Sequence, residues 1–380
     1  MDNYYIGLMT GTSVDSLDAA LVQLPDDGTC QVISTHSIPL PDDIRQCVKD
    51  LVKPGDNEIE KLRWLDQQIA NYSCEAIHHI CQASNIPTRT ITAIGSHGQT
   101  VRHYPSSPHA QGYSLQMGDP NIIAEVTGIT TVADFRRRDI AAGGQGAPLV
   151  PAFHRAVFHS PAEDRIILNL GGIANITHLC STDSANNILG YDTGPANTLL
   201  DNWCWKHQCK SFDHNSEWAL SGTCNKPLLE LLLSDAYFAK GFPKSTGREL
   251  FNVEWLTQAL EKLNHKHRNT LLPEDIQATL LELTISSICK EIESVDRHQQ
   301  ASVYACGGGA NNEVLMQKLG DRMPSRTVST TQVLGIDPNW VEAIAFAWLA
   351  KQTMERKAAN LPSATGANKE VILGGIYLAP

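Results

Sequence analysis

The sequence has no surplus of positive charge and no long apolar run, and each absence excludes a class of protein. Its 30 lysine and arginine residues are outnumbered by 41 aspartate and glutamate residues, and the net charge of −11 repels a nucleic-acid backbone. No apolar stretch approaches the roughly 18 residues that a membrane-spanning helix needs. The first residues also lack the basic start and apolar stretch of a signal peptide. We therefore expect a cytoplasmic protein that binds neither nucleic acid nor a membrane.

Paired cysteines are also missing, although the chain has ten cysteines. None stands in a Cys-x-x-Cys motif, and four residues separate Cys204 from Cys209. Structural zinc sites need tightly spaced ligand pairs, and disulfide scaffolds belong to short secreted chains. We expect reduced, mostly buried thiols.

One pattern of short strands occurs twice. At roughly 150 residues per domain, the 380 residues suffice for two or three domains. A strand, a glycine-containing turn, a strand, a second turn and a third strand are predicted at 4–10, 17–24 and 31–38 and again at 165–170, 175–180 and 188–191. Apolar residues at helical spacing predict helices at 57–83, 196–206, 226–233, 252–264, 273–294 and 340–356. The two segments share this order of strands and turns but have little sequence identity.

Three glycine-containing turns each follow a predicted strand, at Gly11, at Gly171 and Gly172, and at 307–309. Glycine lets the backbone approach a ligand closely and direct several N–H groups at one anion. Each turn alone could be a plain hairpin turn, but their place in a repeated framework favours phosphate binding. The sequence lacks the Gly-x-x-x-x-Gly-Lys-Ser/Thr pattern, and no Gly-x-Gly-x-x-Gly follows a strand, so Walker-type and Rossmann sites are excluded.

Four carboxylates stand at positions where they could bind a metal, act as a general base or stabilise the start of a helix. Asp15 and Asp18 follow the first glycine turn, where a carboxylate could hold hydrated Mg²⁺ beside phosphates or act as an ordinary turn residue. Asp192 ends a predicted strand before a helix, a place suited to a general base or to a helix cap. Glu342 lies in the first turn of an apolar helix, where it could also complement the helix dipole.

Two polar clusters contain side chains that could bind a substrate. His97 lies in a segment, 95–99, that is too rich in side-chain donors for a bland turn. Arg136, Arg137 and Arg138 form a basic trio in an acidic protein, which suits a carboxylate or phosphate but equally fits a solvated face.

These residues together resemble the anhydro-N-acetylmuramic acid kinase family, within the sugar kinase, Hsp70 and actin superfamily, over essentially the whole chain. The most specific matching segments are 9–18, 96–100, 133–136, 143–151, 169–175, 192–195, 244–250 and 365–367. One departure occurs near Asp213, where the family usually reads Tyr-Asp with a nearby glycine and this chain has Phe212 instead. That segment is expected to be peripheral.

The resemblance implies an α/β, actin-like ATPase (ribonuclease H-like) fold. Two duplicated domains, each with a mixed five-stranded sheet flanked by helices, would enclose an active-site cleft. Residues 1–140, joined by part of the C-terminal segment, would form one domain and residues 141–380 the other. The implied reaction uses ATP and Mg²⁺ to convert 1,6-anhydro-N-acetylmuramic acid and water into N-acetylmuramic acid 6-phosphate during peptidoglycan recycling. The family also implies a homodimer.

The resemblance assigns roles to particular residues. Asp192 would be the general base, Glu342 would assist in the sugar site, and Asp15 would hold the metal. The implied nucleotide-binding residues are Gly11, Thr12, Ser13, Val14, Asp15, Ser16, Leu17, Asp18, Asn169, Gly171, Gly172, Gly307, Gly308, Gly309 and Asn311. The implied substrate-binding residues are Ser96, His97, Gln99, Asp134 and Arg136.

Two other classes of function remain open on the residues alone. The superfamily fold also supports nucleotide-dependent switches and chaperone-like ATPases, but this chain has no separate peptide-binding domain or long linker. A glycoside hydrolase could use Asp192 and Glu342 as its carboxylate pair, but the glycine turns would then have no purpose.

Overall fold

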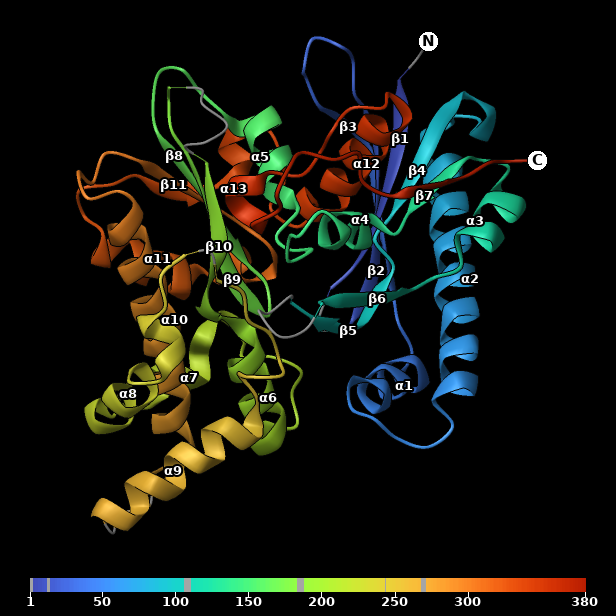
Figure 1. The fold of residues 1–380 in the computed structure, drawn as a ribbon. Helices are drawn as coiled ribbons and strands as arrows, with labels where there is room; N and C mark the ends of the chain where they lie inside the picture. Colours follow the sequence, from blue (N-terminus) through green and yellow to red (C-terminus); the bar gives the residue numbers. More distant parts are fainter. Residues whose placement is uncertain (1–2, 12–13, 106–110, 183–187, 243, 268–270) are drawn as a thin grey trace. The chain divides into compact units, whose positions relative to one another are not determined.

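The computed structural model describes residues 3–11, 14–105, 111–182, 188–242, 244–267 and 271–380 (Figure 1). Its contacts divide the chain into two compact units, Met1–Phe158 with Trp340–Pro380, and His159–Asn339. The boundary expected between residues 140 and 141 falls inside the first unit, and the chain returns to that unit at Trp340. Among the described residues, no helix combines the length and the apolar character that a membrane span requires.

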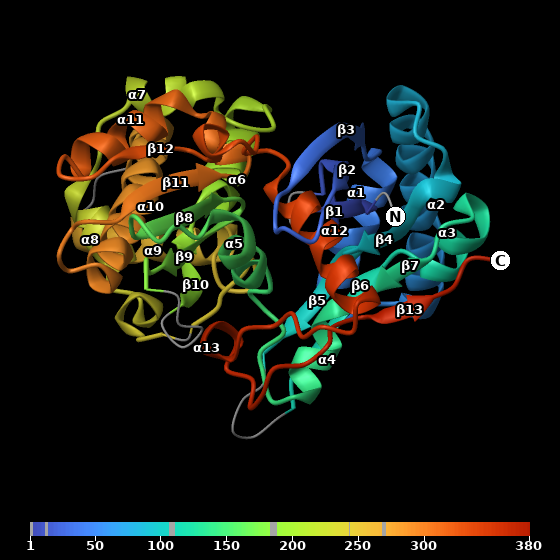
Figure 2. The same ribbon diagram turned by 90° about the horizontal axis from the view of Figure 1, so that it is seen from above.

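The first unit is built on a mixed sheet whose strand order is β13-β7-β4-β1-β2-β3. Strands β1, β2 and β3 pair antiparallel, whereas β4 runs parallel to β1 and β7 parallel to β4. The sheet has six strands rather than the expected five, because β13 adds antiparallel to β7 at one edge (Figure 2). The strand bounds are β1 Tyr4–Thr10, β2 Ser16–Gln23, β3 Gln31–Pro39, β4 Ile91–Ser96, β7 Thr131–Ala133 and β13 Gly375–Tyr377.

The second unit repeats this arrangement with the strand order β10-β9-β8-β11-β12. Strands β8, β9 and β10 form an antiparallel meander, and β11 and β12 continue it in parallel. The two sheets therefore share one topology, three antiparallel strands followed by two parallel ones, which confirms the duplicated ribonuclease H-like fold. The bounds are β8 Arg165–Leu170, β9 Ile173–Leu179, β10 Leu189–Pro195, β11 Ser302–Cys306 and β12 Val328–Thr330.

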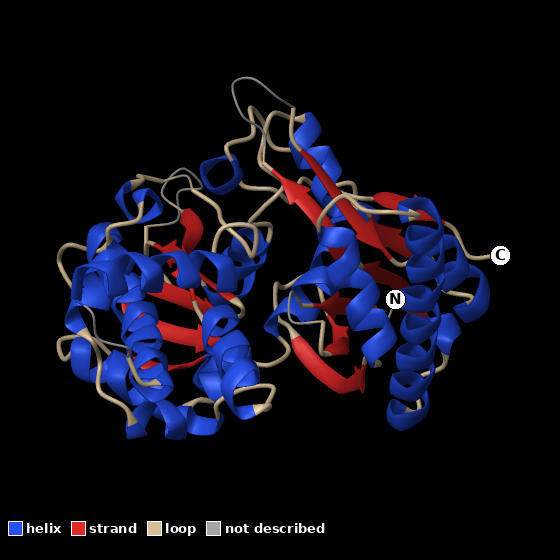
Figure 3. Cartoon of the chain, turned by 90° about the horizontal axis from the view of Figure 1, so that it is seen from below, coloured by secondary structure: helices blue, strands red, loops and turns tan. Residues whose placement is uncertain are grey.

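Helices cover both sheets, as the blue helices around the red strands in Figure 3 show. In the first unit they are α1 Asp42–Val52, α2 Glu58–Ser84, α3 Pro120–Thr127, α4 Phe135–Ala141, α5 Val150–Phe158, α12 Val341–Met354 and α13 Pro362–Thr365. In the second unit they are α6 Asn197–Gln208, α7 Glu217–Ser221, α8 Lys226–Leu233, α9 Val253–His267, α10 Pro273–Val295 and α11 Glu313–Arg322. The short 3₁₀ helices are η1 Thr88–Thr90, η3 His214–Ser216, η4 Ala236–Ala239, η5 Gly308–Asn311 and η6 Thr331–Leu334.

The region between β4 and α3 differs from the sequence-based expectation. The sequence analysis predicts no strand there, but β5 (Gln99–Tyr104) and β6 (Tyr113–Met117) form an antiparallel hairpin. Near the expected departure from the family, Asp213 accepts hydrogen bonds from the backbone N–H groups of Trp218 and Ala219 at 2.9 Å. Asp213 therefore holds the start of α7.

Helix α12 lies unusually close to two strands of the first sheet. A Cβ added at Gly7 would stand 1.7 Å from the carbonyl oxygen of Ala343, and one added at Gly95 would stand 1.9 Å from that of Phe346. Both obstacles are main-chain atoms, which cannot rotate away as a flexible side chain could. Glycine at these positions thus allows β1 and β4 to pack against the backbone of α12.

We predict that Gly95→Ala destabilises the first unit by about 3 kcal/mol, since the new methyl group forces α12 off the sheet. Urea unfolding measures this loss. Gly320→Ala in α11 is the matched control, because a Cβ there meets nothing described within 4 Å; it should be neutral or gain up to about 1 kcal/mol from helix propensity. Equal stability of Gly95→Ala and the wild type would contradict the close packing.

A buried histidine makes the stability of the first unit depend on pH. His154 in α5 is 1% exposed, and burial lowers its pKa to about 3. The folded chain therefore keeps His154 neutral while the unfolded chain takes up a proton below about pH 6.5, so acidification favours unfolding.

We predict that this one group lowers the free energy of unfolding by about 1.3 kcal/mol between pH 7 and pH 5.5. His154→Leu should remove that part of the pH dependence, which urea unfolding at the two pH values measures. An unchanged difference between the two pH values in His154→Leu would show that His154 does not titrate in this way.

Candidate active site

The carboxyl ends of the parallel strands β1, β4 and β7 meet at one edge of the first sheet. Ligands of open α/β sheets bind at such edges. The N–H of His97 donates to the carbonyl oxygen of Leu8 at 3.1 Å, and the Thr10 hydroxyl donates to the carbonyl of Gly98 at 2.9 Å. The first glycine turn, which follows Thr10, and the segment 96–99 therefore lie side by side within this unit.

Arg136 joins this cluster from α4. Its Nε and Nη2 lie 3.1 and 2.9 Å from Nε2 of His97, and its Nη1 donates to the carbonyl of Gly146 at 2.8 Å. His97 is 5% exposed, and burial, followed by the Arg136 guanidinium, lowers its pKa well below the usual value. Because Arg136 donates to Nε2, we infer that His97 is neutral and carries its proton on Nδ1.

The other predicted substrate residues differ in their burial and in their hydrogen-bond partners. Ser96 and Gln99 are buried, and Oε1 of Gln99 has no hydrogen-bond partner among the described residues. Asp134 instead accepts from Nε of Arg137 at 2.7 Å. The basic trio thus divides: Arg136 joins His97, while Arg137 pairs with Asp134.

The turn between β1 and β2 contains the predicted metal ligand. The side chain of Asp15 is 61% exposed and its Oδ1 lies 3.9 Å from Nη1 of Arg45. Asp18 accepts from the hydroxyls of Ser16 at 2.9 Å and Ser37 at 2.6 Å, and burial raises its pKa. Mg²⁺ at phosphates usually takes one or two carboxylates and keeps several waters. The exposed Asp15 carboxylate fits that requirement better than Asp18 does.

Two further predicted nucleotide residues, in this turn and in the following β2, have buried side chains. Val14 and Leu17 are 3% and 1% exposed and belong to the core of the unit. The N–H of Val14 donates to the carbonyl of Gly11 at 3.2 Å. Thr12 and Ser13 lie outside the described residues.

The second and third glycine turns are brought together in the second unit. A Cβ added at Gly307 would stand 2.5 Å from Oδ1 of Asn169, and one added at Gly309 would stand 2.8 Å from Cβ of Leu170. Gly307 also has φ +81°, which favours glycine. A Cβ at Gly308 would meet nothing described within 4 Å. Asn311, in the adjoining 3₁₀ helix, donates to Oδ1 of Asn339 at 2.7 Å.

Helix α6 begins directly at the second glycine turn. The N–H groups of Ala196 and Asn197 donate to the carbonyls of Gly172 and Gly171 at 3.0 and 3.1 Å. Nδ2 of Asn197 donates to the carbonyl of Leu170 at 3.1 Å. The end of β8, the start of α6 and the third glycine turn therefore form one compact corner of this unit.

Asp192 lies within β10, at a register shift between Asp192 and Gly194. The expectation that it ends its strand is wrong, because β10 continues to Pro195 and α6 begins two residues later. Asp192 is therefore not a helix cap. Its Oδ2 accepts from the N–H of Thr246 at 2.9 Å, and its carbonyl accepts from the hydroxyl of Tyr237 at 2.6 Å.

Glu342 stands in the first turn of α12 and is half-buried. It belongs to the first unit, whereas Asp192 belongs to the second. The two predicted catalytic carboxylates therefore belong to different units of the chain.

Several residues that contact or surround the predicted site residues were not themselves predicted. Lys244 and Thr246 lie in the family-like segment 244–250, for which no role was predicted. Both contact Asp192 through their backbone atoms. His103 lies 3.0 Å from the Ser114 hydroxyl, and burial together with Arg136 lowers its pKa to about 4. Thr246 and Asp192 are 54 residues apart, so no local pattern could have revealed their contact. His103 and Ser114 instead face each other across the β5–β6 hairpin.

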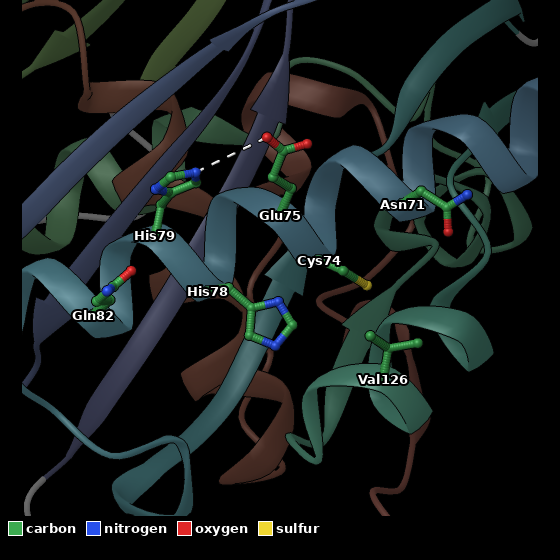
Figure 4. A pocket seen from close by; sticks show the side chains of 7 residues that line it. All are labelled: Asn71, Cys74, Glu75, His78, His79, Gln82 and Val126. Atoms are coloured by element: carbon green, nitrogen blue, oxygen red, sulfur yellow. Dashed lines mark ion pairs between the residues drawn. The ribbon is translucent and has the colours of Figure 1, made fainter.

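A separate pocket of about 390 Å³ lies along α2 and α3. Figure 4 shows its lining side chains, Asn71, Cys74, Glu75, His78, His79, Gln82 and Val126. None of them was predicted as a site residue. Over the described ranges, no three histidine, cysteine or acidic side chains gather as a metal site.

The repeated sheet topology and the paired glycine turns define an actin-like ATPase fold. A family model described as "Anhydro-N-acetylmuramic acid kinase" matches residues 3–379. Curated proteins named anhydro-N-acetylmuramic acid kinase from Shewanella sp. (strain W3-18-1) and Shewanella oneidensis are each 48% identical over 376 residues, covering 99% of this chain and of each relative. This chain belongs to the anhydro-N-acetylmuramic acid kinase family, and the predicted enzyme class, a phosphotransferase, is confirmed.

Two solved structures show more distant similarity. The activator of 2-hydroxyisocaproyl-CoA dehydratase from Clostridium difficile with bound ADPNP has a TM-score of 0.42 and 13% identity, covering 93% of this chain and 97% of its own. A ROK family glucokinase from Streptomyces griseus in complex with glucose and AMPPNP has a TM-score of 0.40 and 11% identity, covering 92% and 99%.

Proposed function

We propose that this protein uses ATP and Mg²⁺ to convert 1,6-anhydro-N-acetylmuramic acid and water into N-acetylmuramic acid 6-phosphate during peptidoglycan recycling. The observation that carries this proposal is the fixed carboxylate of Asp192, held by the N–H of Thr246 in the same unit as two adjoining glycine turns. A positioned base and a phosphate-binding corner on one body are what a coupled hydrolysis and phosphoryl transfer need.

Asp192 acts as the general base in this proposal. It accepts a proton from water while the water oxygen bonds to the anomeric carbon and the bond from that carbon to the bridging oxygen breaks. The released bridging oxygen then bonds to the γ-phosphorus as the bond to ADP breaks. The sugar thereby gains one water and one phosphoryl group, and ADP is the other product. Glu342 is proposed to assist in the sugar site.

The glycine turns bind the nucleotide in this proposal. Gly171, Gly172 and the turn 307–309 bring main-chain groups together without side chains that would block a phosphate. In the first unit, Gly11 and its neighbours serve the same purpose, and Asp15 holds Mg²⁺. The metal, when bound, neutralises charge that develops on the phosphates.

The sugar is bound by the cluster at the carboxyl ends of β4 and β7. Arg136 supplies a cation for an acidic group of the sugar. The proton on Nδ1 of His97 and the Oε1 atom of Gln99 supply a donor and an acceptor that lack partners among the described residues. Ser96 and Asp134 complete the proposed sugar-binding set.

We also propose a homodimer located in the cytoplasm, as family membership suggests. Sedimentation of the purified protein tests the assembly: a single species of one-chain mass over the working concentration range would exclude the dimer.

Release of ADP from Mg-ATP, with and without 1,6-anhydro-N-acetylmuramic acid, tests the proposed function. We expect ADP release to depend on the sugar. Release that is indifferent to the sugar would indicate a switch-type ATPase, and opening of the sugar without ATP would indicate a hydrolase.

A further inference from the structure

The orientation of Asp192 depends on the main chain of residues 244–246, which we call the anchor segment. The N–H of Asp192 donates to the carbonyl of Lys244 at 3.3 Å, and the N–H of Thr246 donates to Oδ2 of Asp192 at 2.9 Å. Both contacts use backbone atoms of the anchor segment. The backbone of this segment therefore helps to fix the direction of the carboxylate.

The side chain of Lys244 fixes the anchor segment to α10. Its ammonium group lies 2.8 Å from Oε1 of Glu291, and these side chains are only 2% and 10% exposed. Oε2 of Glu291 accepts from the hydroxyl of Tyr191, the residue before Asp192, at 3.0 Å. The pair thus holds the strand on one side of the base and the anchor segment on the other.

A second set of contacts closes this arrangement around the base. The ammonium of Lys244 lies 4.9 Å from the ring centroid of Tyr237 and 5.8 Å from that of Tyr191. Tyr237 in turn donates its hydroxyl to the carbonyl of Asp192 at 2.6 Å. The ammonium of Lys244 thus lies beside the ring whose hydroxyl holds the Asp192 carbonyl, while the backbone of the anchor segment holds the N–H and one carboxylate oxygen of Asp192.

A buried ion pair is a weak source of stability, because removing two charges from water costs about as much as their attraction returns. Geometry is therefore the better explanation for this pair. It ties the anchor segment to Glu291, in the C-terminal part of the 23-residue helix α10, and a base is most precise when its supporting groups rest on a rigid element.

We propose that Lys244 and Glu291 are positioning residues for the general base Asp192. This inference rests on the proposed function, because it assumes that Asp192 is the base. The pair acts only through the backbone of the anchor segment and through Tyr191 and Tyr237, so neither residue needs to touch the substrate.

The test compares Lys244→Met and Glu291→Gln with the wild type. We expect kcat to fall about 10- to 100-fold, since small displacements of a catalytic group cost that much. KM for the sugar and for ATP should stay within about threefold, because binding groups are unchanged. Arg326→Met is the matched control: it removes the cation from another buried pair of this unit, Arg326–Asp296, whose side chains are 1% and 7% exposed. It should lower Tm comparably while keeping kcat.

A double variant separates positioning from folding. Lys244→Met with Glu291→Leu leaves no unpaired buried charge, so we expect Tm to recover relative to the single variants while kcat stays low. Recovery of kcat together with Tm, or a loss of kcat as large in Arg326→Met, would overturn the proposal. If Asp192→Asn itself kept normal turnover, the proposed base would fail instead, and the two failures are thereby distinguished.

Discussion

Asp192→Asn is expected to lower kcat by roughly three orders of magnitude, because the amide cannot accept the proton of the attacking water. The substitution is nearly isosteric, and the amide oxygen can still accept from the N–H of Thr246. The glycine turns of the same unit are untouched, so nucleotide binding should be kept. Sugar-dependent ADP release measures kcat, and titration calorimetry measures the affinity for the nucleotide.

Asp213→Asn is the matched control for this substitution. Asp213 is another carboxylate of the second unit that accepts hydrogen bonds from backbone N–H groups, those of Trp218 and Ala219, but it lies just before η3 and α7. Its loss should leave kcat within a few-fold of the wild type. Near-normal turnover of Asp192→Asn would remove Asp192 from the mechanism.

Arg136→Ala is expected to lower kcat/KM for the sugar about 100-fold, since it removes a half-buried charge that makes several hydrogen bonds. The effect should lie mainly in KM for the sugar, with KM for ATP much less changed. The substitution removes a cation for the substrate and also leaves Nε2 of His97 and the carbonyl of Gly146 without these donors. Initial rates with each substrate varied in turn measure the two constants.

Arg138→Ala provides the control for this second substitution, because Arg138 belongs to the same helix and is exposed. It should leave both constants close to those of the wild type. Equal effects of Arg136→Ala on the sugar and on ATP would reassign Arg136 to a structural role.

The sequence predicts the repeated framework well where elements have strong apolar patterns. The predicted bounds of β8 and α8 agree with the structure, and α10 differs by one residue at its end. The β5–β6 hairpin was missed because its strands are largely polar. Side-chain hydrogen bonds such as Gln116 to Thr100 accompany its backbone pairing. Helix α1 was also missed, although Ile44, Val48 and Leu51 carry a helical pattern on its buried face.

Local patterns identify which residues have the right chemistry but not which ones meet. The glycine turns were predicted, yet the contact of Gly307 with Asn169 depends on the parallel pairing of β11 and β8. Burial lowers the pKa of His97 most, and the guanidinium of Arg136, 39 residues further along the chain, lowers it further. The converse also holds: Val14 was predicted from its place in the first turn, but its side chain belongs to the core.

The mass of the sugar product tests the central claim most directly. The reaction is run with Mg-ATP and 1,6-anhydro-N-acetylmuramic acid in ordinary water and in water labelled with heavy oxygen, and the products are compared by mass spectrometry. The account predicts a sugar heavier by one water and one phosphoryl group, with the label in the sugar and none in the phosphoryl group. A product that gains a phosphoryl group without water, or a label found in free phosphate, would contradict coupled ring opening and transfer.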